Sequence, residues 1–156
     1  MKKKFLSSLA ACAVCMTAVL LLTGMTEAME ETKKSQAIGE LVMKRADAMN
    51  GYFAGEVEYS MASELLHDIE SGDLLKEDLF NLESYANTDI DRIEYCRVTE
   101  VLIRSEDEFC VEADVTVEWL TSGLDGIEVM DVTYSAVCEK HGKALKLVQF
   151  FYKKVV

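Results

Sequence analysis

The spacing of the apolar residues changes once along this chain, close to residue 90, and this change restricts the fold more than any other feature. Before it, apolar residues recur about every 3.6 positions, which is typical of amphipathic helices. The pattern predicts helices over residues 37–53 and 59–69 and a shorter helix over 75–82. The two longer helices meet at a break that contains Gly55.

From Ile90 onward the apolar residues alternate with polar ones, which predicts β-strands. The clearest alternation covers residues 109–119, and further strands are expected over 93–103, 130–138 and 144–153. On the first of these strands the period of two begins with Ile93, Tyr95, Val98 and Val101 to Ile103. Neither the predicted helices nor the predicted sheet can bury their apolar side alone. The predicted fold is therefore α+β, with two to three N-terminal helices packed on a curved four-stranded antiparallel meander sheet.

The first 28 residues have the layout of a secretion signal. Lysines occupy positions 2–4, and the segment 5–22 is apolar and uncharged. Cleavage after Ala28 is expected, and the alternatives are a cut after Gly24, retention as a membrane tether through residues 5–22, and lipid attachment at Cys12. We therefore expect an exported protein, extracellular or at the cell envelope, with three parts: signal peptide or membrane anchor 1–28, linker 29–36 and one domain 37–156.

The predicted domain is acidic. The whole chain of 156 residues carries a formal net charge of −12. Loss of the leader, with its three lysines and Glu27, changes this charge to −14. A field of this sign repels phosphate backbones and anionic lipid surfaces. Nucleic acid is therefore not an expected partner. The expected partner is an unknown protein or a small-molecule ligand.

Three cysteines follow the leader, which is an odd number for an exported protein. If the turn at residues 121–126 pairs its two strands, residue numbers across the pair sum to about 247, which brings Cys110 and Cys138 close together. The two lie on different faces of their strands, and a bridge between antiparallel neighbours is strained. We expect Cys96, Cys110 and Cys138 to be free thiols, with a disulfide as the alternative.

The segment Met49-Asn50-Gly51-Tyr52-Phe53-Ala54-Gly55-Glu56-Val57-Glu58-Tyr59-Ser60-Met61-Ala62-Ser63-Glu64-Leu65-Leu66 resembles the helix, small-residue turn and helix that open many members of the nuclear transport factor 2-like superfamily. This cone-shaped fold, also called cystatin-like, places helices before a strongly bent meander sheet. The resemblance covers about residues 37–154. It implies a pocket between the helices and the concave sheet face, used by some relatives for small ligands or isomerase chemistry and by others for association. Candidate pocket residues are Tyr52, Trp119, Tyr134 and Asp131.

No recognisable catalytic or metal-binding set accompanies these residues, so no catalytic residue, metal site or cofactor is predicted. The available acids and bases are scattered along the chain: His67, His141, Glu64, Asp68 and Asp131. Residues 87–91 imitate the start of a calcium loop, but Arg92 and Val98 replace its essential glycine and glutamate. The expected function is a binding or interaction module at the cell envelope. The alternative is an isomerase or dehydratase that uses the pocket, which requires a buried carboxylate or histidine with a shifted pKa.

Overall fold

The computed structural model describes residues 2–85, 92–123 and 126–153, and for residues 2–27, 92 and 123 it describes the backbone alone. The chain divides into two units, Met1–Lys34 and Ser35–Val156. Helix α1 spans Lys2–Phe53. Residues 29–36, expected to be a linker, are therefore helical.

Among the described residues we find no helix that combines the length and the apolar character needed to cross a bilayer. The side chains of the expected tether, residues 5–22, lie outside the described part of the chain. The same holds for the thiol of Cys12 and for the imitation calcium loop at 87–91. The tether and the lipid at Cys12 therefore stay alternatives, and the turn expected at 87–91 stays a prediction.

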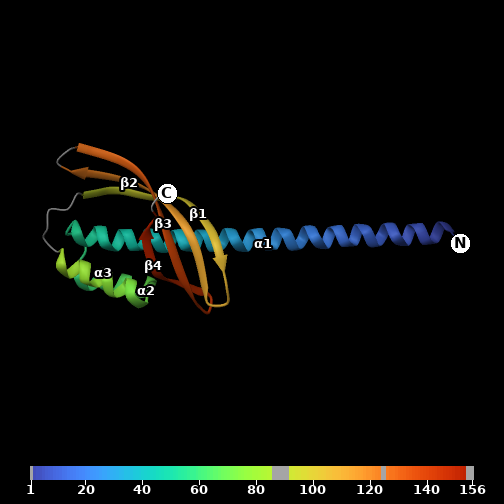
Figure 1. Cartoon of the computed structure of the whole chain (residues 1–156), viewed down its shortest axis with the longest axis horizontal. Helices are drawn as coiled ribbons and strands as arrows, with labels where there is room; N and C mark the ends of the chain where they lie inside the picture. The colour runs from blue at the N-terminus through green and yellow to red at the C-terminus, as the bar shows by residue number, and fades with distance from the viewer. Residues whose placement is uncertain (1, 86–91, 124–125, 154–156) are drawn as a thin grey trace. The chain divides into compact units, whose positions relative to one another are not determined.

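The larger unit is an α+β domain in which the helices precede the strands, as the sequence predicts (Figure 1). After α1 come α2, Tyr59–Ile69, and α3, Gly72–Ser84. The strands are β1 Arg92–Glu106, β2 Cys110–Gly123, β3 Gly126–His141 and β4 Ala144–Tyr152. They form one antiparallel sheet in the order β1-β2-β3-β4, so the predicted meander is confirmed.

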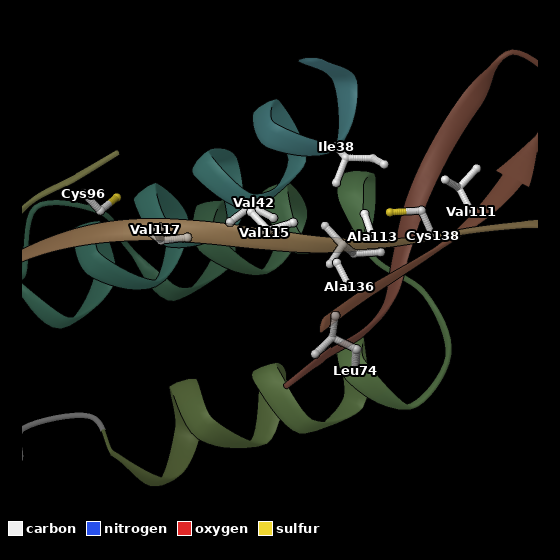
Figure 2. Packing of buried hydrophobic residues seen from close by; sticks show 12 residues of the cluster. Ile38, Val42, Leu74, Cys96, Val111, Ala113, Val115, Val117, Ala136 and Cys138 are labelled. Carbon is white, nitrogen blue, oxygen red and sulfur yellow. The ribbon is translucent and has the colours of Figure 1, made fainter. Parts of the chain in front are cut away.

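The helices bury their apolar stripes against one face of the sheet. Ile38 and Val42 of α1 and Leu74 of α3 belong to one buried cluster with residues of β2 and β3, and Figure 2 shows these side chains together. Leu66 of α2 and Leu82 of α3 belong to a second cluster, formed mainly between helices. Burial of each such side chain is worth about 1.5–3 kcal/mol, so these stripes fix how the helices cover the sheet.

Strand β2 shows the alternation that the sequence predicts. Its odd-numbered residues from Val111 to Val117 are buried, and they lie opposite even-numbered residues of β3 from Cys138 to Val132. Val111 faces Cys138, so paired residue numbers sum to 249, two more than expected. One face of the sheet therefore meets the helices, and the other carries the intervening, mostly polar residues.

Strand β1 departs from simple alternation because its pairing with β2 is interrupted three times, at Glu94, Thr99 and Arg104. Each interruption inserts one residue and resets the phase of the side chains, as β-bulges do. A simple period of two would place Tyr95 on the same face as Ile93, and the bulge at Glu94 prevents this. Tyr95 lies opposite Leu120, on the outer face, and is 47% exposed. The bulges also increase the local twist of an edge strand, which opposes pairing with another sheet.

Candidate functional site

The structure brings together two of the four residues predicted to line a pocket. Trp119 of β2 and Tyr134 of β3 lie on the sheet face that the helices cover, with ring centroids 6.3 Å apart and planes at 78°. Tyr134 in turn stacks on Phe150 of β4, with ring centroids 4.4 Å apart. The guanidinium carbon of Arg45, from α1, lies 5.1 Å from the centroid of the Phe150 ring. We call Trp119, Tyr134 and Phe150 the aromatic row.

Tyr52 and Asp131 do not join this row. Tyr52 packs among the helices, in edge contact with Phe53 and Tyr59. Asp131 lies opposite Glu118, on the outer face of the sheet, and its side chain is exposed. Asp131 and Trp119 thus belong to opposite faces.

Beside the aromatic row is a buried ionic cluster formed by Arg45, Glu70 and Asp78. Arg45 donates two hydrogen bonds to Asp78, from Nε to Oδ2 at 2.6 Å and from a terminal nitrogen to Oδ1 at 2.8 Å. Its Nε also lies 3.1 Å from Oε1 of Glu70. The N–H on Nε points at Asp78, however, and neither oxygen of Glu70 has a hydrogen-bond partner. The Glu70 side chain is fully buried.

Burial is the main reason that the pKa of Glu70 rises from about 4.5 to about 8, and the negative charge of Asp78 adds to the rise. The charge of Arg45 acts in the opposite direction. A protonated Glu70 can also donate a hydrogen bond to Asp78, which further favours the protonated form. Burial likewise raises the pKa of Tyr134, while the indole of Trp119 and the charge of Arg45 lower it. The cluster therefore holds a carboxylic acid that keeps its proton near neutral pH.

The cluster was not predicted, although two of its members leave a sequence signal. On α3 the buried residues are Leu74, Asp78 and Leu82, which are spaced four apart on one helix face. Arg45 similarly follows Leu41 by four residues on α1. A charged residue on an apolar stripe must find a partner, because an isolated buried charge is very costly. This signal could have identified Arg45 and Asp78 as a pair.

A second feature is an open groove of about 500 Å³ between the C-terminal part of α1 and the start of β1. Its polar lining includes the acidic residues Asp47, Glu56 and Glu94, and among the described side chains no lysine, arginine or histidine lines it. Its apolar lining includes Met43, Val57 and Cys96, and the thiol of Cys96 lies 4.0 Å from the sulfur of Met43. The groove therefore combines negative charge with apolar surface.

Asp47 and Cys96 both line this groove. Burial raises the pKa of the Cys96 thiol, and the charge of Asp47 raises it further. Both effects disfavour a thiolate, so Cys96 is a poor nucleophile. The groove is thus suited to holding a positively charged group and unsuited to thiol chemistry.

The scattered acids and bases noted in the sequence do not assemble. His67, Glu64 and Asp68 are exposed on α2. His141 is exposed beside Glu139, with Nε2 3.4 Å from Oε2. In the described part of the chain, no group of three histidine, cysteine, aspartate or glutamate side chains is placed to hold a metal ion.

No family model matches this chain, and no curated protein matches it. Solved structures do. The crystal structure of the intermembrane space region of the chloroplast protein ARC6 superimposes with a TM-score of 0.50 and 16% identity, covering 76% of this chain and 95% of that one. A solution structure of a de novo β-sheet design covers 76% of this chain and 88% of its own, with a TM-score of 0.42 and 20% identity. The ARC6 likeness is one of fold alone.

Proposed function

We propose that this chain is an exported interaction module of the nuclear transport factor 2-like superfamily, which acts at the cell envelope and binds a positively charged segment of a partner protein. The observation that carries the proposal is the groove between α1 and β1, whose described lining includes three acidic residues and no basic one. A lysine or arginine side chain has an apolar stem and a charged end. Its stem fits the surface of Met43 and Val57, and its charge fits Asp47.

Two observations support the location. The first 28 residues have the layout of a secretion signal, and the ARC6 region with a similar fold is described as an intermembrane space region. N-terminal sequencing of the protein isolated from cells should yield a chain that begins at Met29. A chain that keeps residues 5–22 would instead support the membrane tether.

Binding to the groove can be tested with two synthetic peptides on the full chain, one alternating lysine with leucine and one alternating glutamate with leucine. The methyl signal of Met43, labelled with ¹³C, should shift with the basic peptide and stay in place with the acidic one. The charge reversal Asp47→Lys should weaken basic-peptide binding about tenfold, because an exposed ion pair is worth up to about 1 kcal/mol and the new charge repels by a similar amount.

The matched control is Glu77→Lys, which makes the same change of net charge on the exposed side of α3, outside the groove. This variant should bind the basic peptide almost as the parent does. If Glu77→Lys weakens binding as much as Asp47→Lys, the peptide is attracted by the overall charge of the domain and the groove is not its site. If the Met43 signal does not move with either peptide, the proposal fails.

The second candidate function is an enzyme of the isomerase or dehydratase class, and the observation that favours it is Glu70. It is the buried carboxyl group with a raised pKa that such an enzyme requires. Its side chain has no exposed surface, however, so a substrate has no route to it in this conformation. Labelling with a water-soluble carbodiimide and an amine discriminates the two functions. Modification of Glu70 in the native protein supports the enzyme, and an unmodified Glu70 supports the binding module.

A further inference from the structure

The joint between α2 and α3 is attached to the edge of the sheet at Glu70 and Ser71. Glu70 is the C-cap residue of α2, and its backbone N–H donates a hydrogen bond to the carbonyl of Leu66. Its backbone also forms a parallel bridge with Leu147 of β4, and the N–H of Ser71 donates to the carbonyl of Leu147 at 2.9 Å. The short pairing of this joint with β4 thus begins at the residue whose side chain enters the ionic cluster.

The cluster places two carboxyl groups against one guanidinium. Asp78 takes both hydrogen bonds from Arg45, so the two oxygens of Glu70 accept none. If both carboxyl groups are ionised, the cluster holds a net charge of −1 in a place where buried charge is costly. A single proton on Glu70 removes this charge and supplies the O–H donor that Asp78 can accept.

Other charged groups lie near the joint, but they are engaged elsewhere. Lys146 of β4 donates from Nζ to the carbonyl of His67 at 2.7 Å. Glu139 of β3 accepts a long hydrogen bond from Ser71 and lies beside His141. The charges that act on the Glu70 carboxyl group are those of Arg45, from α1, and Asp78, from α3. The ionisation of Glu70 is therefore governed within the cluster.

We propose that Glu70 and Asp78 share one proton beneath Arg45, and that release of this proton to solvent loosens the joint between α2 and α3 from β4. The joint then acts as a proton-operated latch on the covered face of the sheet. The groove lies between α1 and β1, away from this joint. A test of the latch is therefore independent of a test of the proposed binding function.

The direction of the effect follows from the two states of Glu70. In the closed latch the pKa of Glu70 is about 8, and in an open or unfolded chain it returns to about 4.5. The closed state is thus fully favoured below about pH 4.5. The stability that the Glu70 proton gives to the closed state falls as the pH rises from there and is lost by about pH 8. Over this range the equilibrium constant for opening rises by up to about tenfold per pH unit.

The test uses the full chain, with ¹³C-labelled glutamate and amide hydrogen exchange. The side-chain carboxyl signal of Glu70 should titrate with a midpoint near 8. The Ser71 amide, which bonds to Leu147, should lose protection by about tenfold or more between pH 5.5 and 8.5 after correction for intrinsic exchange. Fluorescence of Trp119, the one tryptophan in the chain, reports the aromatic row beside Arg45 during the same titration.

The variant Glu70→Gln keeps the shape and cannot ionise, so its Ser71 protection should be the same at both pH values. Glu77→Gln, an exposed change on the same helix as Asp78, should keep the pH dependence of the parent. A Glu70 midpoint near 4.5, or a Ser71 amide equally protected at both pH values in the parent, overturns the latch. So does a pH dependence that survives in Glu70→Gln. The parent titration decides the question even where the variant does not fold.

Discussion

Arg45 holds Asp78 through two parallel hydrogen bonds, of 2.6 and 2.8 Å, and this pair joins helices whose residues are 33 positions apart. The Asp78 side chain is 1% exposed and that of Arg45 is 20% exposed. A paired guanidinium and carboxylate of this geometry satisfies charges that would otherwise be unpaired in the core. It also seats the guanidinium over Phe150, at the end of the aromatic row.

We therefore expect Arg45→Met to lower the free energy of unfolding by about 3–5 kcal/mol, because it leaves buried carboxyl groups without their cation. Urea denaturation at pH 7 measures this change. The matched control is Arg97→Met, which removes an arginine 3.1 Å from Glu118 on the outer face, where both side chains are more exposed. Its cost should be about 0–1 kcal/mol. Equal costs for the two variants would contradict a special role for the buried pair.

Asp114 should contribute stability that disappears in acid. It lies on the outer face but is only 8% exposed, because Lys153 and Arg104 cover it. The hydrogen bond from Lys153 is the largest cause that lowers its pKa below 3.8, and Arg104 adds to it. A lowered pKa gives stability that is present above about pH 4 and is lost as the pH falls through the folded-state value.

Asp114→Asn should thus lower the free energy of unfolding at pH 7 by about 1–2 kcal/mol, and by less at pH 3. Asp131→Asn is a control with the same chemistry on the same face, at an exposed position. It should change stability by less than about 0.5 kcal/mol. Denaturation of the parent and the two variants at pH 3 and pH 7 checks both statements. An Asp114→Asn effect as large in acid as at neutral pH would contradict the stabilisation of the Asp114 carboxylate by Lys153 and Arg104.

The order of the elements could be predicted from the sequence because the spacing of apolar residues is a local property of the chain. The helices at residues 37–53 and 59–69 end where α1 and α2 end, and the meander follows from short turns between alternating strands. The face of Tyr95 could not be predicted in this way. A bulge at Glu94 depends on pairing with a strand some 25 residues away, so it leaves no trace in local alternation.

The site was predicted less well for a related reason. Trp119 and Tyr134 do lie together on the covered face, because aromatic residues on the apolar face of a strand point toward the helices. Glu70 looked like an ordinary polar residue at a helix end, and it is buried because the joint pairs with Leu147 in β4. Its burial depends on tertiary contacts, and local composition carries no signal for such contacts.

Two glycines of α1 should respond oppositely to the same substitution. A Cβ atom at Gly51 would lie 2.8 Å from Cγ2 of Val57, at the wall of the groove, whereas one at Gly39 would make ordinary contacts of 3.6–3.9 Å with Val98 and Val101. Gly39→Ala should raise stability by about 0.5–1 kcal/mol through helix propensity. Gly51→Ala should lower it by about 1–3 kcal/mol through overpacking.

Thermal or urea denaturation of both variants measures these changes. The double variant Gly51→Ala with Val57→Ala removes the atom that the new methyl group would meet. It should recover part of the loss relative to the Val57→Ala protein alone. A Gly51→Ala protein as stable as Gly39→Ala would show that the turn after α1 shifts freely, and the groove wall would then not be rigid.

The thiols of the domain should differ sharply in reactivity, and they should not pair. Cys138 is fully buried, and burial raises its pKa to about 12. Cys110 is partly exposed and lies opposite Glu139, on the other face of the sheet from Cys138. At pH 8 iodoacetamide should therefore modify Cys110 first and leave Cys138 and Cys96 unmodified until urea unfolds the chain, since the thiolate is the reactive form. Peptide mapping separates these sites from Cys12 and Cys15, and a peptide pair linking Cys110 to Cys138 without reductant would refute this arrangement of the two strands.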